Sequence, residues 1–174
     1  MVLTRRTLTA SLALLLAGLL YSSAPTYAGT APSVNEVAPR AAAPLANGKW
    51  EKKILKQTNK HRKKNGCKAL KANNKLRKAA RKHTKLMAAS KQLSHQLPGE
   101  ATLGKRITQA GYRNWRAVAE NIAYGYANPK AMVKAWMNSP GHRKNILNCS
   151  YRHLGVGVKV QNGVPWATQD FGRK

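Results

Sequence analysis

The sequence predicts an α+β domain in which amphipathic helices come first and an antiparallel pair of strands comes last. From Trp50 to Leu147, apolar residues recur at the three- and four-residue spacing of helices. From Leu154 onward they alternate with glycine and polar residues, which is the pattern of a strand. Helices followed by a hairpin pack as layers around one core, and 174 residues are enough for one such domain.

The first 28 residues have the pattern of a secretory signal peptide. Arg5 and Arg6 precede an apolar run from Leu8 to Leu20 that is too short to span a membrane, and small residues of a cleavage site end at Ala28. The paired arginines also fit a twin-arginine export signal. No later apolar run is long enough to span a bilayer, so we expect a secreted, extracellular protein.

Residues 29–48 are rich in Ala, Pro, Asn and Gly and show no apolar period. We therefore expect a flexible leader there and a folded domain over residues 49–174. No internal repeat is present, and we expect a monomer.

The charge of the chain is extreme, with 32 Lys and Arg against five Asp and Glu. Removing residues 1–28 takes away two arginines and no acid, which leaves a formal net charge of +25. Solubility explains part of this charge, but we expect strong, salt-sensitive attraction to polyanions such as wall polymers, anionic lipid or extracellular nucleic acid. The basic residues of 49–91 form no helix-turn-helix and no aromatic-interleaved pattern, so sequence-specific nucleic-acid recognition is not expected.

Two long helices are predicted first. One begins at Trp50 and ends before Gly66, with a very basic outer face, and the second begins at the cap Asn73 or Asn74 and ends near Ser90. His83 lies on the inner face of the second helix, where a hydrogen-bonded core histidine is a better interpretation than a ligand.

Shorter helical segments follow. Residues 102–110 form a third helix stopped by Gly111, and a fourth helix is capped by Asn128 and ends at the turn of residues 139–141. One more helical turn is expected over residues 142–147.

The strand pair runs from Leu154 to Val160 and from Val164 to Phe171, with Asn162-Gly163 as the hairpin turn. Pro165 predicts that the second strand begins at a sheet edge. Gly155 and Gly157 leave one face bare, so we expect something to pack or bind closely there.

Glu120, His95 and His142 are the candidate site residues. Glu120 is one of five carboxylates and lies in a run of apolar and small residues, and His142 leaves the Ser-Pro-Gly turn. A carboxylate and an imidazole brought together form either a structural hydrogen-bonded pair or a reactive site. His95 follows the second helix, where spacing alone favours a partner for the helix dipole over catalysis.

Cys67 and Cys149 are the two cysteines. In an exported chain an even count favours one disulfide, although two free thiols remain the alternative. On the chain-entropy model, closing this loop stabilises the fold by about 4.5 kcal/mol. Neither cysteine belongs to a CxxC motif, so a cysteine metal site is not expected.

Four motifs in order carry a resemblance to a known family. They are Ser94-His95, AENIA at 119–123, AWMNSPGHRKNIL at 135–147 and LGVGV at 154–158. Together they resemble the CAP superfamily, the SCP-domain proteins that include cysteine-rich secretory, antigen 5 and pathogenesis-related proteins, and above all its bacterial secreted members. The resemblance covers about residues 50–172. It implies an α-β-α sandwich with a small central antiparallel sheet flanked by helices.

The resemblance also implies a central cleft with two histidines and two acids, in which the histidines can hold a divalent metal. His95, Glu120 and His142 match three of these four positions. Ser139 takes the place of the second acid, and no Asp or Glu lies between Asn121 and Gln169. The chain therefore departs from the full set, and a two-carboxylate mechanism is excluded.

Two histidines and one carboxylate suit Zn²⁺ or another divalent cation, with Glu120 as third ligand or as general base. The alternative, which we favour slightly, is that the three residues brace a buried cleft by hydrogen bonds. We therefore expect non-enzymatic binding of a lipid, a sterol or an anionic surface. The rival hypotheses are a metal-dependent hydrolase of peptide or cell-wall polymer, and a cationic antimicrobial or scaffold protein.

Overall fold

The structure is a computed structural model that describes residues 47–174, so the expected signal peptide and nearly all of the expected leader lie outside the described residues. In chain order the elements are α1 (Asn47–Lys64), β1 (Lys71–Ala72), α2 (Asn74–Ser90), α3 (Leu103–Gln109), β2 (Ala117–Tyr124), α4 (Pro129–Asn138), α5 (Pro140–Leu147), β3 (His153–Gln161) and β4 (Val164–Arg173). Within residues 47–174, no helix is long and apolar enough to cross a bilayer.

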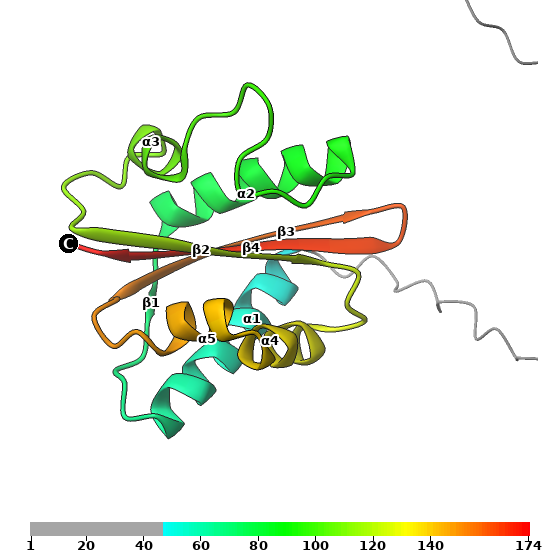
Figure 1. Cartoon of the computed structure of the whole chain (residues 1–174). Coiled ribbons are helices and arrows are strands. Elements are labelled where there is room, and N and C mark those ends of the chain that lie inside the picture. The colour runs from blue at the N-terminus through cyan, green and yellow to red at the C-terminus, as the bar shows by residue number, and fades with distance from the viewer. Residues whose placement is uncertain (1–46) are drawn as a thin grey trace, which may run out of the picture. The chain divides into compact units, whose positions relative to one another are not determined.

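The elements form three layers (Figure 1). The four strands lie in the order β1-β3-β4-β2, with α2 and α3 on one face of the sheet and α1, α4 and α5 on the other. This confirms the predicted α+β class and the α-β-α sandwich. The sheet is mixed, because β1 pairs parallel to β3 through Lys71 and Ala72, while the other pairings are antiparallel.

The predicted helix boundaries are confirmed within a few residues. The side chain of Asn73 accepts hydrogen bonds from the first turn of α2, and Asn128 does the same for α4. Gly66 has a positive φ of 73° just after α1, as expected of a residue that ends a helix.

The hairpin of β3 and β4 turns at Asn162-Gly163, where both residues have positive φ. The expectation from Pro165 holds for the start of β4, because Val164 and Pro165 pair only with β3, but from Trp166 onward β4 lies between β3 and β2. The sequence analysis did not identify β2 as a strand. Pro165, which has no N–H to donate, lies just before the first residue of β4 that pairs with β2, and its carbonyl accepts a hydrogen bond from Gly125 N at 2.9 Å.

The bare face at Gly155 and Gly157 is covered by the backbone of α2. A Cβ at Gly155 would lie 2.2 Å from the carbonyl carbon of Leu76, and one at Gly157 would lie 2.4 Å from that of Ala80. The glycines therefore bring the helix against the sheet, and no ligand is needed to explain them.

A disulfide and a buried arginine both connect the end of α1 to the loop after α5. Cys67 and Cys149 form the predicted disulfide. The fully buried Arg62 donates hydrogen bonds to the carbonyls of Lys68, Ile146, Asn148 and Tyr151. None of the acids that the structure describes pairs with Arg62, and the partners of its guanidinium there are backbone oxygens.

Candidate functional site

Glu120 on β2 lies at the centre of a buried polar cluster between the sheet and the α2–α3 layer. Its Oε2 accepts a hydrogen bond from Arg106 Nη2 of α3 at 2.5 Å. Its Oε1 lies 2.9 Å from His95 Nδ1 and 3.7 Å from His83 Nε2 of α2. The side chain is 1% exposed, so both carboxylate oxygens are used inside the protein.

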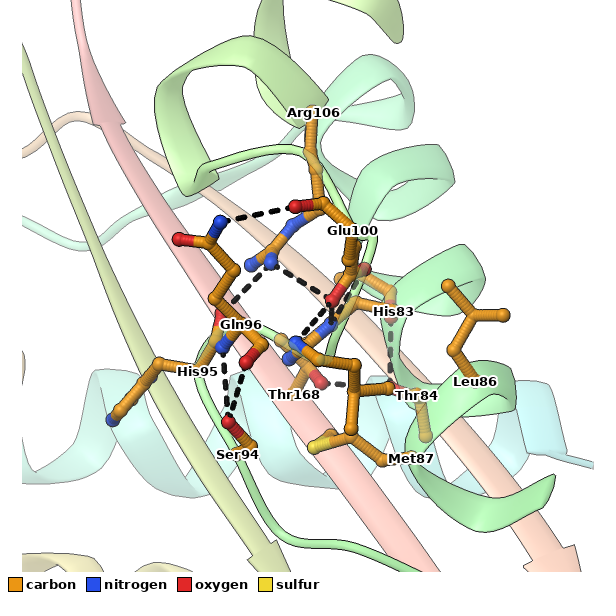
Figure 2. Close-up of polar contacts among 12 residues, drawn as sticks. His83, Thr84, Leu86, Met87, Ser94, His95, Gln96, Glu100, Arg106 and Thr168 are labelled. Atoms are coloured by element: carbon orange, nitrogen blue, oxygen red, sulfur yellow. Dashed lines mark hydrogen bonds and ion pairs between the residues drawn. The ribbon is translucent and has the colours of Figure 1, made fainter. Parts of the chain in front are cut away.

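Glu100 is a second carboxylate of the cluster, held by the same arginine (Figure 2). Both of its oxygens lie 2.9 Å from His83 Nδ1, and Oε2 lies 3.3 Å from Arg106 Nη1. Arg106 also donates to the carbonyl of His95 at 2.8 Å. Arg106 therefore joins two carboxylates to the loop that carries His95. The interpretation of His83 as a hydrogen-bonded core histidine agrees with this position, since its ring is fully buried.

Asp170 is the third carboxylate of the cluster and faces Glu120 across the β2–β4 register. It is 1% exposed, and neither of its oxygens has a hydrogen-bond partner. Burial raises the pKa of Asp170 well above its usual value, and the negative charge of Glu120 raises it further, against a smaller opposing effect of Arg106. Asp170 therefore holds a proton under conditions in which an exposed aspartate is ionised.

The pKa of Glu120 moves in the other direction. Burial alone would raise it, but the hydrogen bond from His95 and the positive charges of His83, Arg106 and His95 outweigh burial and lower it. Glu120 is thus the ionised member of the carboxylate pair and Asp170 the protonated one.

His142 reaches this region from the opposite layer. It belongs to α5, and its carbonyl accepts a hydrogen bond from Asn121 Nδ2, next to Glu120 on β2. Asn145 of the same helix donates to the carbonyl of Glu120 at 3.2 Å. Burial lowers the pKa of His142, and the charge of His95 lowers it further, so the two imidazoles lie near enough to interact. Both residues contact β2, an edge strand, His95 through the Glu120 side chain and the His142 carbonyl through Asn121.

The metal ligands predicted from sequence are only partly assembled. Within residues 47–174, no group of three His, Cys, Asp or Glu side chains has the geometry to hold a metal ion. Glu120 does not fit the place of a third ligand, because both of its oxygens are engaged. It fits the place of a partner that orients His95 through Nδ1 and leaves Nε2 available. His95 makes this contact instead of acting at the end of α2.

Sequence reasoning missed three members of the cluster, which are Glu100, Arg106 and Asp170. None lies in the four motifs that carried the family resemblance. The signal that could have found Glu100 and Asp170 is the scarcity of acids, since the chain has only five, whereas nothing distinguishes Arg106 among 32 Lys and Arg. Ser139, which stands where the second acid was expected, instead precedes α5 as its N-cap.

The fourth acid of the described residues, Glu51 of α1, is also buried. Its two oxygens accept hydrogen bonds from Arg81 of α2, each at 2.7 Å. Glu51, Glu120 and Asp170 are at most 5% exposed, and the Glu100 side chain is 7% exposed. The outer surface formed by residues 47–174 therefore presents cationic side chains and no exposed acidic one.

Comparison with known proteins gives consistent matches. Residues 55–171 match the family described as CAP, the cysteine-rich secretory protein family. The uncharacterized protein YkwD of Bacillus subtilis is 39% identical over 131 residues, which are 75% of this chain and 50% of YkwD. The chain thus spans about half the length of that curated relative.

Two solved structures share the fold. An extracellular SCP-domain protein of Bacillus anthracis has a TM-score of 0.67 and 32% identity, over 76% of this chain and 45% of the other. An outer surface protein of Borrelia burgdorferi has a TM-score of 0.69 and 21% identity, over 75% of this chain and 96% of the other.

Proposed function

The chain belongs to the CAP family of cysteine-rich secretory proteins, and from this membership we propose an extracellular protein that binds anionic polymer surfaces without catalysis. The observation that carries the proposal is the burial of all four acidic side chains of residues 47–174. Cations on the surface are therefore not neutralised by neighbouring acids, and a polyanion approaching from any side meets an attractive field.

Catalysis is not part of this proposal because the cleft has no free carboxylate. Glu120 is bonded through both oxygens to His95 and Arg106, and Asp170 is buried and protonated. A general base must reach the proton that it removes, directly or through one water. Hydrolysis through Glu120, which the sequence offered as the rival hypothesis, has no support from this geometry.

The test is the salt dependence of binding to an immobilised anionic polymer. We expect the affinity to fall by orders of magnitude between about 50 and 200 mM salt, as it does when six to ten anionic groups are neutralised. Glu120→Gln and His142→Ala should bind like the wild type, because neither changes an exposed cation. Binding that is indifferent to salt, or lost in these two variants, would contradict the proposal.

A second candidate function is a divalent-metal site at His95 and His142. The specific observation is the 2.9 Å contact of Glu120 with His95 Nδ1, since a carboxylate in this position orients metal-bound histidines. Two imidazole nitrogens would hold the ion, with Zn²⁺ as the natural choice.

Calorimetric zinc titration tests the metal site directly. We expect one ion bound by the wild type and by a His61→Ala control, and none by His95→Ala/His142→Ala. Absence of zinc binding in the wild type would leave the histidines as cleft architecture. Binding of a sterol or another lipid stays a prediction of the family resemblance.

A further inference from the structure

The edge of β3 opposite β4 is only briefly covered by another strand. β1 pairs with β3 at Lys71 and Ala72 alone, so the edge from Val156 onward has no strand partner among the described residues. Glu51 of α1 lies at this edge, where its Oε1 accepts a hydrogen bond from Val158 N at 3.4 Å. Arg81 of α2 holds the same carboxylate, so the two helices meet across the open edge.

A hollow lies at this meeting point, between α1 and α2. It is lined by Ala72, Asn73 and Asn74, by the buried Leu154 and Val156 beneath them, and by the cations Lys52 and Arg77. A second hollow shares Asn74 and Arg77 with the first and continues along α2. The two hollows therefore adjoin at Asn74 and Arg77, and we call the surface that they form together the edge groove.

Cations follow the edge groove on both helices. On α2 they are Arg77, Lys78, Arg81, Lys82 and Lys85, and on α1 Lys52 is continued by Lys56, Lys60 and Lys63, which line a further hollow. Spacings of three, four and seven residues place each row on one side of its helix, and Lys52 to Lys63 spans about 16 Å. Among the acids of residues 47–174, only Glu51 lines these hollows, and it pairs with Arg81.

We propose that the edge groove binds one chain of a linear phosphodiester polymer whose charged groups are separated by neutral, non-aromatic units. Lysines act as point charges toward phosphate and need no fixed geometry, so a flexible repeating chain satisfies them. The lining at Ala72, Asn73 and Asn74, between Lys52 and Arg77, carries no charge, which suits the uncharged units. This inference rests on the proposed function and deepens it by naming the surface and the class of polymer.

Two other polyanions fit the edge groove less well. Single-stranded nucleic acid is normally held by aromatic side chains that stack on bases, and no aromatic residue lines these hollows. A membrane surface would favour exposed large apolar side chains, but those of the described residues, Leu86, Leu93, Tyr124 and Val164, line none of the three hollows.

Two matched variants test the surface. The groove variant is Lys52→Gln/Arg77→Gln/Lys78→Gln/Lys82→Gln. The control variant, Lys130→Gln/Lys134→Gln/Arg143→Gln/Lys144→Gln, removes three lysines and one arginine from α4 and α5 instead. Both lose four charges, and Arg81 is kept in both because it holds Glu51. Unchanged thermal unfolding verifies that each variant is folded.

The probe is a synthetic poly(glycerol phosphate) chain in solution, with phosphatidylglycerol vesicles and an oligothymidylate as comparison ligands. We expect the groove variant to bind the polymer roughly 100-fold more weakly than the wild type at 100 mM salt. The slope of log K against log salt should become less steep by about 3, because four contacts are lost at about 0.7 each. The control variant should stay close to the wild type. The wild type should prefer the polymer to vesicles and to the oligonucleotide.

The outcomes separate the two proposals. Equal losses in both variants, or a preference for vesicles or oligonucleotide, would overturn the edge groove and leave general binding to anionic surfaces in place. Absence of salt-sensitive binding to all three ligands would overturn both. Independently of any variant, bound polymer should protect Lys52, Lys78 and Lys82 of the wild type from amine acylation more than Lys130, Lys134 and Lys144, and equal protection would also overturn the groove.

Discussion

Replacing Asp170 by Asn should stabilise the protein, and by more as the pH rises. Asp170 is buried without a hydrogen-bond partner and faces the ionised Glu120 across two paired strands. Burial, reinforced by that charge, raises its pKa, so the folded protein retains a proton that the unfolded chain releases near pH 4. Asn has the shape of the protonated acid and is likewise uncharged, but it needs no proton to remain so.

The sign and size follow from proton linkage. Above about pH 4 the folded state binds one more proton than the unfolded state, so the wild-type free energy of unfolding falls by about 1.4 kcal/mol per pH unit from this group. The fall continues until the pH passes the pKa of Asp170 in the folded protein. The advantage of Asp170→Asn therefore grows at that rate and then becomes constant.

Urea denaturation at half-unit steps from pH 5 to pH 8 measures this difference. The lowered pKa of Glu120 gives stability that is lost only as the pH falls through that pKa, below this range. Glu51→Gln is the control, because Glu51 is bonded to Arg81 and its loss should destabilise the protein throughout. A constant difference between Asp170→Asn and the wild type, or a destabilised variant, would refute the assignment of the proton to Asp170.

Three further substitutions test the fold around the site. Arg106→Met should cost about 3–5 kcal/mol in urea denaturation, because it leaves Glu100 and Glu120 without their shared cation; a loss under 1 kcal/mol would contradict this role. Gly157→Ala should lower the free energy of unfolding by about 1–3 kcal/mol, and with it the melting temperature, since its Cβ would overlap the α2 backbone. An unchanged melting temperature would argue against such close packing. Cys67→Ser/Cys149→Ser should cost up to about 4.5 kcal/mol, and unchanged stability under non-reducing conditions would mean that the disulfide adds nothing.

Periodicity and capping residues predicted most of the fold. The helices, the final hairpin and its Asn-Gly turn were all visible, because each depends on local spacing and on one or two turn or cap residues. β2 was missed because AVAENIAY contains a charged residue and an amide in the middle of a small-residue run. Its Glu120 and Asn121 are buried on opposite faces, so the usual alternation of polar and apolar residues is absent.

The position of β4 could not be predicted for a related reason. Pro165 marks only the start of β4, which has no β2 partner, and says nothing of the rest of the strand, which pairs with β2 from Trp166 onward. Gly155 and Gly157 correctly predicted a close approach, but sequence alone could not choose between a helix and a ligand.

The candidate site was half predicted. Family motifs found His95, Glu120 and His142, which the structure brings to the β2 edge from three separate segments. Arg106 and Glu100 were not found, because their role depends on contacts between α2, α3 and the loop between them. The contacts of Glu120 decide its role, because the hydrogen bond from Arg106 keeps it a buried anion whose other oxygen orients His95.

The use of acids connects the cleft with the surface. Each carboxylate of residues 47–174 lies near at least one cation or imidazole, and three of the four share Arg106 as a neighbouring charge. The acids of residues 47–174 therefore belong to the interior, and the surface cations that we propose for binding are not part of the cleft. Substitutions can separate the two, so a binding activity that survives changes at Glu120 and fails after changes at Lys52 and Lys78 must belong to the surface.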